Sequence, residues 1–353
     1  MKKRNFAVIA AALAAISTSS AFADETTLKN RSIAYVMTAD HWAMFATADG
    51  KVECPDGVND GPREEYAKLF PNDGKKRTLV ETSLEREGSI WFPTLTNDAH
   101  PFKDSKSKVV NGLNLDGKVG PNDYDTPSGE KGIDNQFNRA LGCVDTFRPD
   151  NGNYLNLSLN LQRKAWGRML IEITNVDSLA NDDDVTVTWY KARDPLLQDS
   201  TGSGFLPYGT QRIDTKRGGI FTARTHGKIV NGVLMTDPVD MTFTYNYYQA
   251  AYATYKFRDA RFKMNVTPDQ ANGLLGGYVD IDSFYRAEVK TMSTFTLSFG
   301  REAPQAVYRQ LYKLADAHPD PETKRNTAIS AAKELKFQRV YIQRDEKRVA
   351  EAQ

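Results

Sequence analysis

The middle of the chain alternates hydrophobic and polar residues with a period of two. In the segment 154–162 every second residue is a leucine, within the sequence YLNLSLNLQ. Successive side chains of a strand point to opposite faces of a sheet, so this pattern predicts a strand with one buried face. Four further segments are predicted strands: MLIEITNV (169–176), DVTVTWYKA (184–192), DMTFTYNYY (240–248) and ARFKMNVT (260–267).

Tight turns are expected between the strands. Asn231-Gly232 lies between the apolar arms of GKIVNGVLMT (227–236), which is a strong hairpin signal. The segment KVVNGLNLD (108–116) repeats the pattern around Asn111-Gly112 and predicts a similar turn. Strands joined by short turns predict a mainly β protein with an antiparallel, β-sandwich-like core.

Short helices are predicted around this core. Residues 61–71 carry a proline in the first turn and another at the end, which suits a short helix. In residues 132–143 the apolar side chains Ile133, Phe137 and Leu141 share one helical face. The segment 304–321 shows the same periodicity and predicts a C-terminal helix.

The first 23 residues have the features of a signal peptide. Three basic residues precede an apolar run at 6–16, and Ala21-Phe22-Ala23 forms a cleavage pattern before Asp24. The run is about half of the ~20 residues that a membrane-spanning helix needs, although an uncleaved anchor is the alternative. No later segment is apolar enough to span a membrane, so a periplasmic or secreted protein is expected.

Charge and composition indicate a folded body without a nucleic-acid role. The chain has 353 residues and a net charge of +1, and cleavage would remove three positive charges, which gives +1 − 3 = −2. That balance does not favour binding to nucleic acid. We expect a turn-rich part at 24–150 packed on a β-rich part at 151–353, or a single domain over 24–345, because no long linker separates them.

The two cysteines, Cys54 and Cys143, predict a disulfide. In an oxidising compartment an isolated pair is most simply joined. A catalytic cysteine is the alternative, but neither residue has a histidine beside it in sequence. A C-x-x-C motif is absent, which argues against zinc-ribbon and haem-attachment sites.

An acidic, glycine-rich stretch at 116–136 is the candidate ion site. Calcium prefers several oxygen ligands on a flexible loop. The candidate ligands are Asp116, Asp123, Asp125, Asp134 and Asn135. The alternative is a turn-rich loop whose side chains bond its own backbone, with Asp134 as a helix N-cap.

A tyrosine-rich segment at 244–257 is the candidate ligand surface. Aromatic faces on a β scaffold can stack on sugar rings and other amphipathic ligands. The candidate side chains are Tyr247, Tyr248, Tyr252 and Tyr255. The alternative is that these rings simply pack inside the sheet.

No catalytic motif stands out. The four histidines are scattered, and the common metalloprotease, nucleophile-elbow and phosphate-loop motifs are missing. The leading hypothesis is a binding or envelope-structural protein whose partner is a small molecule, a glycan or an envelope protein. The alternative is an enzyme acting on a polysaccharide or other envelope polymer through carboxylates or His41.

Several ordered pieces resemble a group of uncharacterised exported proteins from Gram-negative bacteria. The pieces are ECPDGVNDGPREEY, DYDTPSGEKGIDNQFNRALGC, IEITNVDSLANDDDVTVTWY, GVLMTDPVD, LLGGYVDID and LADAHPDPETKRNTAIS. They extend over most of residues 33–335. The resemblance implies one coherent exported unit and implies no activity.

Overall fold

The structure is a computed structural model. It describes residues 28, 30–47, 51–59, 84–86, 89–91, 102–144, 147–148, 168–201, 204–216, 218–245, 253–298 and 304–344. Three predicted elements lie outside the described residues: the signal peptide, the helix at 61–71 and the strand at 154–162.

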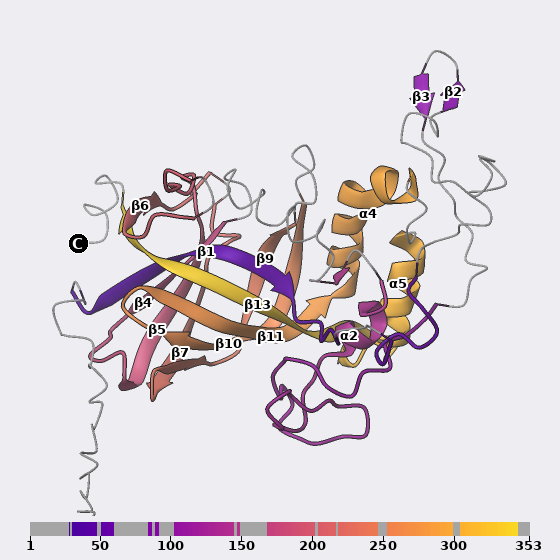
Figure 1. Cartoon of the computed structure of the whole chain (residues 1–353), viewed down its shortest axis with the longest axis horizontal. Coiled ribbons are helices and arrows are strands. Elements are labelled where there is room, and N and C mark those ends of the chain that lie inside the picture. The colour runs from indigo at the N-terminus through magenta and orange to yellow at the C-terminus, as the bar shows by residue number, and fades with distance from the viewer. Residues whose placement is uncertain are drawn as a thin grey trace, which may run out of the picture.

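The described residues form a mainly β fold in which most strands are hydrogen-bonded into one large sheet (Figure 1). Eight strands follow one another in the sheet, and pairing of the last with the first closes the path into a ring. In ring order they are β1 (Ser32–Trp42), β4 (Met169–Thr174), β5 (Asn181–Lys191), β7 (Ala223–Val230), β8 (Val233–Thr236), β10 (Ala253–Val266), β11 (Gln270–Asp280) and β13 (Asn326–Gln343).

Three more strands attach to this ring, and all but one of the pairings are antiparallel. They are β6 (Gly209–Arg212), which pairs in parallel with β13, β9 (Val239–Tyr245) on β10, and β12 (Ala317–Pro319) on β13. A separate hairpin joins β2 (Leu84–Arg86) and β3 (Ser89–Trp91). The predicted sandwich is not confirmed, because the large sheet does not divide into two.

Within the described residues, the strands predicted at 169–176, 184–192, 240–248 and 260–267 are found as β4, β5, β9 and β10, and the hairpin at Asn231-Gly232 is confirmed. Both turn residues have positive φ, 51° and 79°, as a two-residue turn between twisted strands requires. The turn predicted at Asn111-Gly112 is wrong. The residues on either side of it form isolated β-bridges to other segments instead: Val109 pairs with Asp125, and Leu113 pairs with Asp134. Gly112 lies so close to the Ile133 side chain that an added Cβ would come within 2.6 Å of it.

Aromatic side chains fill the inside of the ring. Trp189 of β5 lies 5.7 Å from Phe262 and 6.3 Å from Phe337 between ring centroids, so strands from different sides of the ring meet there. Burial of such rings contributes much of the stability of a core.

Three helices gather at one end of the ring (Figure 1). They are α2 (Gln136–Leu141), α4 (Ile281–Ser298) and α5 (Pro304–Lys313). Phe137 of α2 stacks on Trp42 with ring centroids 4.1 Å apart, and Phe284 of α4 meets Trp42 edge-on at 5.9 Å. The helices therefore extend the core beyond the strands.

The chain beyond α5 differs from the prediction. The helix expected over 304–321 ends at Lys313, and the chain continues as β12 and the long strand β13. β1 lies between β4 and β13, so residues from both predicted parts share one sheet. No helix in the described part of the chain is long and apolar enough to cross a membrane.

The predicted disulfide is present. Cys54 and Cys143 are joined, with their Cα atoms 5.7 Å apart. The bond ties the segment before the acidic loop to the residues that follow α2.

Candidate functional site

A groove lies on the face of β1, β11 and β13 that points away from the core. Along β13 the side chains alternate: Leu335 and Phe337 are each 1% exposed, whereas Lys336 is exposed and Gln338 half-buried. This alternation leaves a row of polar side chains on the outer face of a well-packed strand.

Strand register brings the polar side chains together. Gln270 of β11 pairs with Gln338, and Asn272 pairs with Lys336. Residues directly opposite on neighbouring strands have side chains on the same face. On the other side of β13, the register of β1 shifts between Met37 and Ala39.

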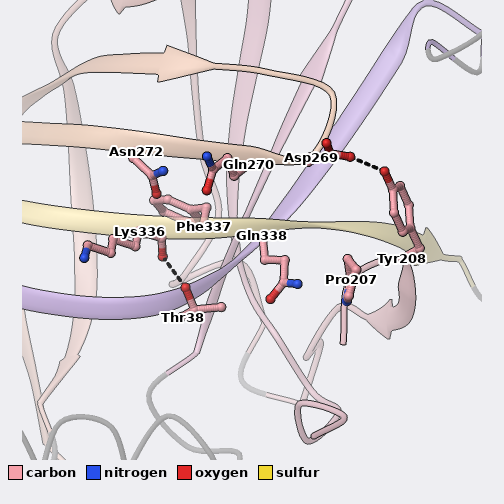
Figure 2. A pocket seen from close by; sticks show the side chains of 9 residues that line it. All are labelled: Thr38, Pro207, Tyr208, Asp269, Gln270, Asn272, Lys336, Phe337 and Gln338. Atoms are coloured by element: carbon pink, nitrogen blue, oxygen red, sulfur yellow. Dashed lines mark hydrogen bonds between the residues drawn. The ribbon is translucent and has the colours of Figure 1, made fainter. Parts of the chain in front are cut away.

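Thr38 occupies that irregularity in β1. Its hydroxyl donates a hydrogen bond to the backbone carbonyl of Lys336 at 3.1 Å (Figure 2). A bulge re-aims a side chain and bends the strand. Thr38 is one of the residues that line the groove.

Tyr208 forms one end of the groove. Its hydroxyl donates a hydrogen bond to the carboxylate of Asp269, in the turn between β10 and β11 (Figure 2). This hydrogen bond raises the pKa of Tyr208 above its ordinary value. The Tyr208 amide donates to the Arg339 carbonyl at 2.8 Å.

The backbone of Tyr208 is in the left-handed region, with φ at 62°. This conformation is uncommon for a bulky residue and persists only where the surroundings hold it. Here the amide bond to β13 and the hydroxyl bond to Asp269 hold it. Tyr208 nevertheless stays 47% exposed.

The groove has a volume of about 630 Å³. Its lining residues are Thr38, Pro207, Tyr208, Asp269, Gln270, Asn272, Lys336, Phe337 and Gln338. The lining is rich in groups that both donate and accept hydrogen bonds, with one ammonium group, the exposed aromatic residue Tyr208 and the buried Phe337. No segment singled out in the sequence contains this set, because its members come from four separate parts of the chain.

His41 of β1 and Glu334 of β13 pair on the same face of the sheet as the groove, and Glu334 is two residues before Lys336. The His41 Nε2 atom is 2.9 Å from a Glu334 carboxylate oxygen, and the Asn111 amide donates to the other oxygen at 2.7 Å. The hydrogen bond with His41 lowers the pKa of Glu334. The His41 Nδ1 atom is buried, without a partner among the described residues. Neither ring nitrogen is open to a substrate, so this geometry favours a structural role for His41.

The acidic loop uses most of its candidate ligands on its own backbone. The carboxylates of Asp116 and Asp134 accept hydrogen bonds from the Lys118 and Leu115 amides at 2.8 and 2.6 Å. Asp123 accepts from the Gly120 amide. This arrangement agrees with the alternative interpretation, a turn-rich loop whose side chains bond to its own backbone.

The remaining two candidates have other partners. Asp125 pairs with Lys131 at 2.8 Å. Asn135, and not Asp134, is the N-cap of α2, since its side chain accepts from the Asn138 amide at 3.1 Å.

Three of the five, Asp116, Asp123 and Asp134, line a second cavity of about 380 Å³, together with Arg139 and Lys313. Within the described ranges, no group of three or more His, Cys, Asp or Glu side chains is placed to hold a metal ion. The calcium site therefore stays a prediction.

The tyrosine prediction fails at Tyr255. Its side chain is 1% exposed, and its ring packs 5.7 Å from Phe243 and 5.6 Å from Phe284. Strand β10 turns this residue into the core, so the ring has no face for a ligand. The other three candidates, Tyr247, Tyr248 and Tyr252, lie outside the described residues.

Comparison of the chain with protein-family models, with curated proteins and with solved structures finds no match.

The acidic loop makes stability depend on pH through Asp134. Burial raises the pKa of Asp134 from 3.8 to about 6, against the hydrogen bonds from the Leu115 and Asp116 amides, which lower it. The folded protein therefore holds this proton more tightly than the unfolded chain. The stabilisation that comes from this tighter proton binding is fully present below about pH 4 and is lost as the pH rises through about 6.

We expect Asp134→Asn to remove this part of the pH dependence. Relative to the wild type, the variant gains stability between pH 4.5 and 7.5, measured as free energy of unfolding in urea. Asp125→Asn is the matched control, since it removes a loop carboxylate that is exposed and paired with Lys131. Parallel pH profiles for the wild type and Asp134→Asn would contradict the prediction.

Proposed function

We propose that the protein binds a polyhydroxylated ligand, a glycan, in the groove over β1, β11 and β13. The observation that supports this most is the lining itself: three amide side chains and an exposed tyrosine ring on one rigid sheet. Amide groups offer a donor and an acceptor side by side, which suits neighbouring sugar hydroxyls. The Tyr208 ring offers a face for the apolar side of a sugar.

The size and setting of the groove also support a ligand site. Its volume of about 630 Å³ lies within the ~300–1,000 Å³ usual for ligand pockets. The amides of Gln270 and Asn272 are placed by continuous strand pairing rather than by a loop. Such placement keeps them in position before the ligand arrives and lowers the entropic cost of binding.

Binding fits the groove better than hydrolysis does. Most glycosidases need two carboxyl groups on opposite sides of the scissile bond. Among the described lining residues Asp269 is the one carboxylate, and its hydrogen bond to Tyr208 engages it. The signal-peptide pattern at 1–23 supports an exported protein, which would meet envelope or extracellular polysaccharides.

The test is calorimetric titration of the purified protein with a panel of oligosaccharides. We expect at least one to bind, and Asn272→Ala and Tyr208→Ala each to weaken it about tenfold, which corresponds to ~1.4 kcal/mol. The matched control is Asn265→Ala, an exposed amide opposite Asn272 on β10 that does not line the groove. Urea unfolding of each variant separates lost binding from lost folding.

Two results would contradict the proposal. One is that no oligosaccharide in the panel binds at millimolar concentration. The other is that Asn265→Ala weakens binding as much as Asn272→Ala does.

A further inference from the structure

The two ends of the groove differ in charge. Lys336 stands at one end with an exposed side chain, and no described carboxylate lies within ion-pair distance of its ammonium group. Tyr208 and Asp269 stand at the other end (Figure 2). An ammonium group that forms no ion pair with the described carboxylates remains available to an anionic ligand.

Two carboxylates on this side of the sheet, those of Glu334 and Asp269, are already engaged. Glu334, two residues before Lys336 on the same face of β13, has its two oxygens held by His41 and Asn111. Asp269 accepts the hydroxyl proton of Tyr208. Both carboxylates are therefore hydrogen-bonded to other groups, and Lys336 acts on Glu334 through its charge alone, which adds to the His41 hydrogen bond in lowering the pKa of Glu334.

The distance between the two ends of the groove suits a ligand that is longer than a single functional group. Lys336 lies three residues before Arg339, whose amide bonds to the Asp269 carbonyl. Three residues of strand extend ~10 Å. Between the two ends lie the amides of Gln270, Asn272 and Gln338, which carry no charge.

We propose that the ligand is an acidic oligosaccharide, of the uronic-acid class, whose carboxylate pairs with Lys336. Its neighbouring hydroxyls meet the amides of Asn272 and Gln270, and a further ring lies against Tyr208. This inference rests on the proposed function, since it names the class of glycan that the same groove takes.

The test compares a galacturonate tetrasaccharide with its methyl ester, which has the same shape without the charge. In calorimetric titration at low salt, we expect the acid to bind about fivefold more tightly than the ester. That is the upper end of what one exposed ion pair contributes. Added salt should narrow the difference, because mobile ions screen exposed charges.

The variant Lys336→Met removes the charge and keeps most of the apolar stem. We expect it to bind acid and ester equally, with the ester as tight as in the wild type. Lys228→Met is the matched control, because Lys228 is an exposed lysine on β7 outside the groove. It should keep the fivefold preference.

The outcomes separate this inference from the proposed function. If acid and ester bind the wild type equally, the inference is wrong and glycan binding stands. If Lys336→Met keeps the preference, the charge that matters lies elsewhere and the inference is again wrong. If neither tetrasaccharide nor any other glycan binds, both proposals fall.

Discussion

Replacing both cysteines, as Cys54→Ala with Cys143→Ala, is expected to lower the free energy of unfolding by about 4 kcal/mol. The disulfide joins residues 89 positions apart. In the chain-entropy model, a loop of that length restricts the unfolded chain enough to stabilise the folded state by ~4–5 kcal/mol. Alanine is preferred to serine because Cys143 is fully buried. A buried hydroxyl without a partner would add its own penalty.

Urea unfolding of wild type and double variant measures the difference. The control is a reducing agent, which should bring the wild type down to the stability of the variant and leave the variant unchanged. A loss below about 1 kcal/mol would show that the bond constrains the unfolded chain much less than its length implies.

The second large effect is expected from Glu53→Gln. The Glu53 and Arg148 side chains are 1% and 7% exposed, and their charged groups lie 2.7 Å apart. Glutamine keeps the shape of the side chain but removes the negative charge that lies against the buried Arg148 guanidinium. Breaking a buried pair in this way typically costs ~3–5 kcal/mol.

A double-mutant cycle separates the pair from its surroundings. Glu53 also accepts a hydrogen bond from the Thr47 amide at 2.6 Å, and Arg148 donates to the Gly142 carbonyl at 2.9 Å. We expect Glu53→Met with Arg148→Met to lose less stability than the two single replacements together, because no unpaired charge remains. Additive losses, or a loss below about 1 kcal/mol for Glu53→Gln, would contradict the prediction.

The sequence was most informative where a pattern is repeated locally. β4, β5 and β10 follow from apolar and β-branched side chains within each segment. The β7–β8 hairpin follows from Asn231 and Gly232, whose own backbone preferences suit the turn. α4 escaped prediction, although a local signal exists: the Asp280 side chain accepts from the Ser283 amide at 2.8 Å, one turn into the helix.

Predictions failed where a distant contact decided the outcome. Asn111-Gly112 has the residues of a hairpin turn, yet Asn111 bonds to Glu334 and Gly112 packs under Ile133. Tyr255 belongs to an aromatic segment that could face either way, and packing against Phe243 and Phe284 turns it inward. The acidic loop suggested converging ligands, whereas most of its carboxylates bond to nearby amides.

By itself, the sequence determined strands β4, β5, β9 and β10, one hairpin and the pairing of the only two cysteines, and it missed the long strands β1, β11 and β13. Each of the features that it determined depends on neighbouring residues or on simple counting. The groove was decided by tertiary structure alone. Thr38, Gln270 and Lys336 are separated by up to about 300 residues, and they meet because β1 and β11 both pair with β13. A shift of one residue in either register would turn these side chains toward the core, and that register is set by packing throughout the ring.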